Sequence, residues 1–149
     1  MQARAFEVSW FTSPVFRFLN TCVVALLLTL PATIVWADPT GRYNVVGTNP
    51  DSGGQYRGTV RVTRTGETYR VVWDIAGTRY TGTGLGALVQ DGRYTVGPAH
   101  PDDTSISIGY VSGNSFGQAF YFLQKDGSWK GIWTYGGSNK IASENWYPR

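Results

Sequence analysis

The sequence predicts an all-β domain, a small antiparallel up-and-down barrel of about eight strands, with a two-sheet β-sandwich as the alternative. Short runs rich in β-branched and aromatic residues alternate with Gly-containing turns about every ten residues after Asp38. No stretch in this region combines a helical period with a cap and a stop. Lys and Pro, which protect exposed sheet edges, are scarce, and this favours a closed barrel without edges.

Residues 1–37 differ in composition from the rest of the chain. They contain none of the 19 Gly and none of the nine Tyr, and an uncharged run extends from Thr21 to Ala37. Two basic residues, a short apolar run and a Val-x-Ala ending predict a signal peptide that is cleaved after Ala37. A retained membrane anchor is the alternative, but the run of about 16 residues is interrupted by Pro31 and falls short of the roughly 20 that span a bilayer. We therefore expect a secreted or periplasmic protein without a stable membrane anchor.

Residues 38–149 form a single predicted domain. Removal of residues 1–37 from the 149-residue chain leaves 112 residues with 11 basic and nine acidic side chains and no Cys. A domain of this length buries enough surface to fold without disulfides. A net charge of +2 gives no reason to expect binding to nucleic acid or to an anionic membrane.

The strands follow from apolar and aromatic runs that end at turn residues. They are expected near 41–48, 55–65, 68–75, 78–89, 92–97, 104–112, 116–125, 128–136 and 140–147.

Two turns set the register of the first four strands. A two-residue hairpin at 66–67 pairs Val60 with Trp73, and a second at 76–77 pairs Trp73 with Tyr80. These pairings place apolar side chains on one face and charged ones on the other. The charged face carries four arginines: Arg57, Arg61, Arg70 and Arg79. It is either a solvated face with one or two ion pairs, or a basic stripe for an acidic partner or a polysaccharide.

The later strands have two apolar faces. A two-residue turn at Asp126-Gly127 pairs Phe120 with Trp133, and one at Gly113-Asn114 pairs Ile108 with Ala119. One face then carries aliphatic residues with two tyrosines, and the other carries rings interleaved with Ser, Gln and Gly. The aromatic face is the candidate ligand or partner surface: Phe120, Phe122, Trp129, Trp133 and Tyr135. Two interpretations are open, because such rings serve equally as bulky core or as the lining of a binding site.

An aromatic residue precedes Gly by two positions at three places in the domain. The segments are Tyr56-Arg57-Gly58, Tyr80-Thr81-Gly82 and Trp129-Lys130-Gly131. Residues two apart share a face of a strand, so the pattern predicts sheet bending at glycines that neighbouring rings cover.

The residues for catalysis or metal binding are few. His100 is the single His, and it lies in the Pro- and Asp-rich segment 97–103, which predicts a surface loop. No Cys remains after cleavage, and acidic residues such as Glu67, Asp74 and Glu144 form no compelling pair. We therefore expect no catalytic, cofactor-binding or metal-binding residues and a protein that is not an enzyme.

Several segments resemble a family of small secreted bacterial β-proteins, some of which are described as fibronectin-binding. They are Gly-Thr-Asn-Pro-Asp at 47–51, Tyr-Arg-Gly-Thr-Val at 56–60, Arg-Thr-Gly-Glu-Thr-Tyr-Arg-Val-Val-Trp at 64–73, Gly-Thr-Arg-Tyr-Thr-Gly-Thr-Gly at 77–84 and Gly-Ile-Trp-Thr-Tyr-Gly-Gly at 131–137. The resemblance implies a shared fold and binding of a host protein, and it offers no catalytic residues. The Pro- and Asp-rich stretch 90–103 departs from the family pattern.

These observations predict an exported, non-enzymatic binding domain without cofactors. Its partner would be a host or envelope protein, such as a fibronectin-like protein, or a small apolar ligand. One alternative is an inhibitor that acts on a secreted enzyme through a loop such as 97–103. Another is a cyclase- or isomerase-like barrel enzyme, which requires a titratable group inside a cavity.

Overall fold

The computed structural model describes residues 37–149, and the predicted signal peptide lies outside these residues except for Ala37. The described chain forms nine strands and no helix. The strands are β1 (Gly41–Thr48), β2 (Gln55–Thr65), β3 (Thr68–Ile75), β4 (Thr78–Gln90), β5 (Arg93–Val96), β6 (Ser105–Ser112), β7 (Ser115–Leu123), β8 (Trp129–Tyr135) and β9 (Ala142–Pro148). The nine predicted strands are confirmed.

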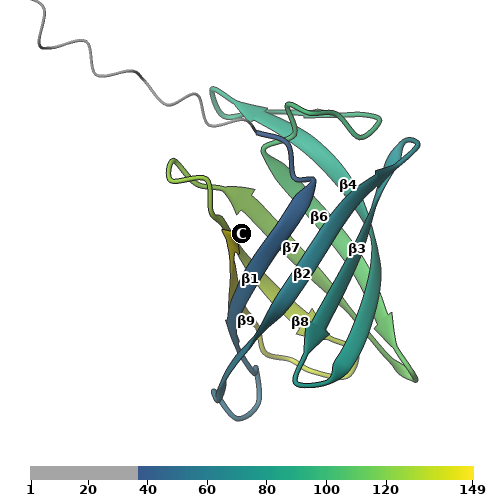
Figure 1. Cartoon of the computed structure of the whole chain (residues 1–149), viewed down its shortest axis with the longest axis vertical. Coiled ribbons are helices and arrows are strands. Elements are labelled where there is room, and N and C mark those ends of the chain that lie inside the picture. Colours follow the sequence, from purple (N-terminus) through teal and green to yellow (C-terminus); the bar gives the residue numbers. More distant parts are fainter. Residues whose placement is uncertain (1–36) are drawn as a thin grey trace, which may run out of the picture. The chain divides into compact units, whose positions relative to one another are not determined.

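Eight of these strands close into an antiparallel up-and-down barrel (Figure 1). Each strand pairs with the next along the chain, except that β4 pairs with β6, and the ring is completed where β9 pairs with β1. The closing pairs include Val45 opposite Trp146. The predicted barrel is confirmed, and the sandwich alternative is excluded because the strands form one continuous ring.

β5 lies outside the ring. The end of β4 continues past its pairing with β6 and turns back as a short hairpin, with Ala87 opposite Val96 and Gln90 opposite Arg93. The hairpin turn is Asp91-Gly92, with φ angles of 51° and 73°, the left-handed backbone that a type I′ turn requires. All four residues of β5 are exposed, so this strand extends the barrel wall without adding to its core.

The predicted registers of the first half are confirmed. Val60 lies opposite Trp73, Trp73 lies opposite Tyr80, and Val62 and Val71 face each other inside the barrel. The turn between β3 and β4 forces Ala76 to a φ of 50°, a conformation that a side chain with a Cβ disfavours.

The predicted register between β7 and β8 is wrong by one residue. The structure places Phe122 opposite Lys130 and Ala119 opposite Trp133, because the connection is a five-residue turn from 124 to 128 and not a two-residue one. In this turn the Asp126 carboxylate accepts hydrogen bonds from the backbone N–H of Ser128 (3.0 Å) and from its hydroxyl (2.6 Å).

The longer turn is favoured because it keeps Lys130 out of the barrel interior. In the predicted register Lys130 would share a face with Tyr121, which is buried inside the barrel. Burying an unpaired ammonium group is unfavourable, and a slip of one residue moves every side chain of a strand to the opposite face. The observed register exposes Lys130 and brings the buried Trp129 into the core.

The barrel interior is filled by large rings that lie against small residues. Trp129, Trp146, Tyr69 and Tyr121 are fully buried, together with branched aliphatic side chains. A Cβ at Gly82 would approach Ile108 to 2.6 Å, and one at Gly84 would approach the side chain of Ile106 to 2.8 Å. Of the three glycines predicted to lie beneath neighbouring rings, Gly82 has the Trp73 ring at 3.2 Å from such a Cβ and Gly131 lies against the Tyr121 ring, whereas Gly58 meets Asp74 and Ile75.

Candidate ligand-binding cavity

The barrel opens at one end into a cavity of about 560 Å³ that is continuous with solvent. The surrounding connections are the loop between β1 and β2, the turn between β3 and β4, and the start of β7. Seven aromatic side chains line it: Tyr56, Trp73, Tyr80, Tyr110, Tyr121, Trp133 and Tyr135. This volume lies in the range of about 300–1,000 Å³ that is typical of small-molecule sites.

The rings follow one another around the wall in edge-to-face contact. Tyr80 and Tyr110 have centroids 6.2 Å apart, and Tyr110 and Trp133 have centroids 6.4 Å apart. Tyr56 meets Trp133 at 6.1 Å with planes inclined by 72°. Small residues lie opposite the rings on the paired strands: Gly82 opposite Tyr110 and Ala119 opposite Trp133. Of these two small residues, Ala119 lines the cavity.

A buried carboxylate, Glu144 on β9, lies at the inner end of this cavity. It is 3% exposed and accepts four hydrogen bonds from side chains. The donors to Oε1 are Trp146 Nε1 (2.7 Å), Tyr121 Oη (2.8 Å) and Trp73 Nε1 (2.9 Å). The Tyr56 hydroxyl donates to Oε2 at 2.5 Å. Every donor is a ring that also forms part of the core, so the carboxylate holds four strands together.

Two glycines give these donors access to Glu144. Gly47 on β1 and Gly131 on β8 are its direct neighbours across the sheet. A Cβ at Gly47 would collide with the Tyr56 ring, and one at Gly131 would collide with Tyr121. The positions beside Glu144 therefore stay free of side chains, and the two tyrosines occupy the space.

The carboxylate also affects the tyrosines electrostatically. Burial, followed by the Glu144 charge, raises the pKa of Tyr121 well above its usual value and raises those of Tyr56 and Tyr110. These phenols therefore stay protonated at neutral pH and act as donors.

Trp133 offers a hydrogen-bond donor that the described residues leave without a partner. Its Nε1 is buried and meets no acceptor within residues 37–149. An indole N–H can only donate, and a buried donor without a partner is unfavourable. At the mouth, the Tyr135 hydroxyl donates to Asp51 in the loop between β1 and β2. The cavity thus combines aromatic walls with a polar rim.

The predicted aromatic face is divided between the two sides of the sheet. Trp133 and Tyr135 line the cavity. Trp129 is a core residue at 1% exposure. Phe120 and Phe122 lie outside the barrel, with ring centroids 4.9 Å apart. The division is the direct result of the one-residue difference in register.

Sequence reasoning missed six lining residues: Tyr56, Trp73, Tyr80, Tyr110, Tyr121 and Glu144. A signal for Glu144 was present in the period-two pattern of β9, because Ala142, Glu144 and Trp146 alternate with Ser143 and Asn145. A carboxylate at an inward-facing position between two buried residues needs partners, which are buried rings on other strands.

The opposite end of the barrel is covered by the segment predicted as a surface loop. His100 and Asp102 are exposed as expected, but Asp103 is buried. The Asp103 carboxylate accepts hydrogen bonds from the Tyr69 hydroxyl (2.6 Å) and from the backbone N–H of His100 (2.8 Å). The backbone N–H of Ala99 also donates to the carbonyl of Glu67 at 2.9 Å. This segment therefore packs against the barrel end.

Among residues 37–149, no three side chains of the His, Cys, Asp or Glu type come together as a metal site. The same part of the chain has no helix that is long and apolar enough to cross a membrane.

Comparisons with protein-family models, with curated protein sequences and with solved structures find no match to this chain.

Proposed function

We propose that the chain is an exported, non-enzymatic binding protein whose barrel holds a small, largely apolar ligand. The observation that carries this proposal is the aromatic-lined cavity of about 560 Å³ at one end of the barrel, while the other end is packed and covered. Ring faces and edges suit a flat or alicyclic hydrocarbon skeleton. Polar side chains at the rim, such as Asn49 and Ser52, suit a carbonyl or hydroxyl oxygen on that skeleton.

The test uses N-phenyl-1-naphthylamine, an uncharged probe whose fluorescence rises in an apolar site. We expect saturable binding to the purified domain at one probe per chain. Ala119 lies opposite Trp133 at the inner wall, so Ala119→Leu places a larger side chain in the cavity and should weaken binding at least 10-fold. Tyr80→Ala removes a half-buried ring from the wall and should also weaken binding.

The matched control is Phe122→Ala, which removes a ring from the outer surface. This variant should bind the probe as the unsubstituted domain does. The proposal fails if Ala119→Leu folds, by circular dichroism, and binds the probe unchanged. It also fails if the Phe122→Ala variant loses binding while the cavity variants keep it, since the site would then lie outside the barrel.

A second candidate, a cyclase- or isomerase-like barrel enzyme, is supported by the Glu144 carboxylate in the cavity. Its Oε2 accepts one hydrogen bond, from Tyr56, and so keeps a lone pair for a substrate proton. Under this reading Glu144→Gln would bind ligand but lose turnover, whereas a binding protein has no turnover to lose.

A further inference from the structure

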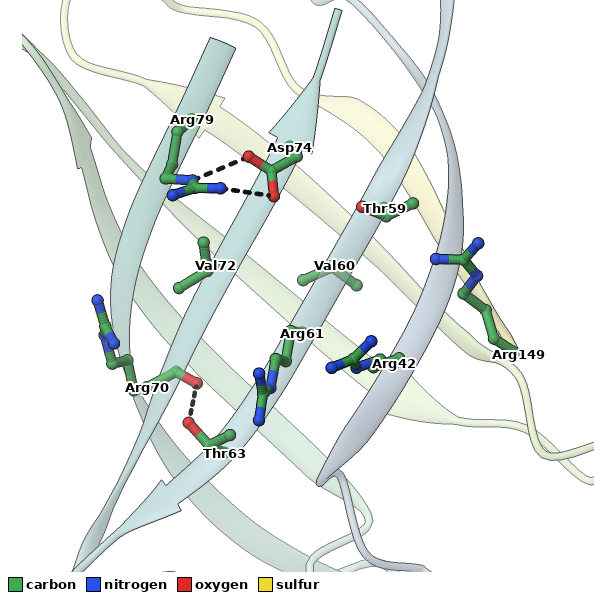
Figure 2. A pocket seen from close by; sticks show the side chains of 10 residues that line it. All are labelled: Arg42, Thr59, Val60, Arg61, Thr63, Arg70, Val72, Asp74, Arg79 and Arg149. Carbon is green, nitrogen blue, oxygen red and sulfur yellow. Dashed lines mark hydrogen bonds and ion pairs between the residues drawn. The ribbon is translucent and has the colours of Figure 1, made fainter. Parts of the chain in front are cut away.

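The outer face of β1 to β4, together with Arg149 after β9, carries a cluster of arginines that is separate from the cavity (Figure 2). It forms a groove of about 490 Å³ on the solvent side of the sheet. Five of the ten lining residues are arginines: Arg42, Arg61, Arg70, Arg79 and Arg149. Of the stripe predicted from the sequence, Arg61, Arg70 and Arg79 belong to this groove, and Arg57 is not among its lining residues.

The register places positive charges next to one another. Arg42 lies directly opposite Arg61, and Figure 2 shows their side chains next to each other on the groove floor. Thr63 pairs with Arg70, which lies on the next strand. Like charges directly opposite on a sheet destabilise it. The fold therefore carries an unfavourable arrangement that an anion would relieve.

The described residues supply almost no counter-charge. Asp74 is the one acidic side chain among the described lining residues, and both of its oxygens are already bound by Arg79, at 2.9 and 3.3 Å. Arg42, Arg61, Arg70 and Arg149 form no ion pair within residues 37–149. Their guanidinium groups remain available to an external partner.

The chemistry of the groove points to an oxyanion on a polar carrier. Guanidinium forks match the geometry of phosphate and sulfate oxygens. Thr59 and Thr63 lie between the arginines with half-buried side chains, and their hydroxyls suit the hydroxyls of a sugar. None of the ten described lining residues is aromatic, whereas sites for single-stranded nucleic acid combine basic residues with rings for base stacking.

We infer that this groove is a second binding site, for sulfate or phosphate esters carried on an anionic carbohydrate. The inference is independent of the cavity, because the groove lies on the outer side of the strands whose inner side faces the core.

The experiment measures binding of fluorescently labelled dextran sulfate by anisotropy, with unsulfated dextran as the uncharged probe. We expect binding of dextran sulfate alone. If three arginines each neutralise one anionic group and release about 0.7 counterion per contact, the affinity falls about 20-fold between 50 and 200 mM NaCl. The triple variant Arg42→Gln, Arg61→Gln, Arg70→Gln should bind at least 10-fold more weakly at 50 mM NaCl and lose most of this salt dependence.

A matched triple variant removes the same charge elsewhere. Arg57→Gln, Arg93→Gln and Lys130→Gln change exposed residues that do not line the groove, so this variant should keep its affinity. Equal losses in the two triple variants would overturn the inference, because net charge and not the groove would then govern binding. All six positions are exposed, and circular dichroism checks that both variants remain folded.

Three further results would overturn the inference. The first is absence of dextran sulfate binding at 50 mM NaCl. The second is complete competition by inorganic sulfate or phosphate at a matched concentration of anionic groups, which would show a site for a free anion. The third is tighter binding of oligo(dT) at matched charge, which would assign the groove to nucleic acid.

Discussion

The buried carboxylate at the end of the cavity gives the most quantitative prediction. Glu144→Ala removes the acceptor for three buried donors, Trp73 Nε1, Tyr121 Oη and Trp146 Nε1. A buried donor left without a partner costs about 1–3 kcal/mol. The vacated space joins the cavity, where water can reach some of these donors, so we take the lower part of the range. The expected loss is about 3–5 kcal/mol in the free energy of unfolding.

The assay is equilibrium unfolding in urea, followed by tryptophan fluorescence and by far-ultraviolet circular dichroism. With a denaturant dependence of about 1.5 kcal/mol per molar urea, the transition midpoint should fall by about 2–3 M. Glu144→Gln retains a carbonyl oxygen for the same three donors, and its amide can donate to the Tyr56 hydroxyl. This variant should therefore be at least about 2 kcal/mol more stable than Glu144→Ala.

Glu67→Ala is the control for loss of a carboxylate, because Glu67 is exposed in the turn between β2 and β3 and its substitution should change stability by about 0.5 kcal/mol or less. The reasoning is refuted if Glu144→Ala lowers the midpoint by less than 0.5 M. It is refuted equally if the Ala and Gln variants are the same within error, since hydrogen-bond satisfaction would then not be what Glu144 provides. A gain in stability would mean that desolvation of the carboxylate outweighs its four hydrogen bonds.

Three other predictions test the core, a strained turn and the buried phenols. Trp129→Ala should lower the free energy of unfolding by about 3–5 kcal/mol in urea titrations, because Trp129 is 1% exposed. Phe122→Ala on the outer face should lower it far less. Equal losses in the two variants would contradict the observed register. Ala76→Gly should raise the free energy of unfolding by about 0.5–1 kcal/mol, because glycine adopts a φ of 50° without the strain that alanine has there. Thermal unfolding measures the change, and no gain would mean that the turn stores no strain. Burial raises the pKa of Tyr43 to about 12 and that of Tyr121 well above its usual value, so both favour the neutral phenol in the folded state. Their contribution is present below pH 10 and is lost as the pH rises above it, so these two residues should remove about 2 kcal/mol between pH 10 and pH 11; urea midpoints that stay constant over this interval would contradict the assignment.

The turn at 124–128 shows where local sequence signals fail. Asp126-Gly127 is a strong two-residue hairpin signal, and Gly127 does adopt a positive φ of 79°. The Asp126 side chain, however, binds Ser128 and widens the turn. The Asp126-Gly127 dipeptide does not predict which register keeps Lys130 in solvent. That register depends on which face of the sheet lies inside the closed barrel.

The cavity could be predicted only in part for a related reason. Trp133 and Tyr135 belonged to the predicted face, and both line the cavity. Tyr56, Tyr80 and Tyr110 lie on three other strands, and the preference of Tyr for strands does not say which end of the barrel its ring will occupy. The donors to Glu144 are separated from it by up to 88 residues along the chain. They meet only after the barrel closes.

The sequence by itself determined the fold class, the nine strands and the registers of the first half. These features follow from period-two patterning and from turn residues, which act over a few neighbours in the chain. The tertiary structure decided the closure of β9 on β1, the register of β8 and the convergence of four rings on Glu144. Each of these depends on which side chains can be buried together at a single closed interface, and burial of a charged group is favourable only when its partners arrive from several strands at once.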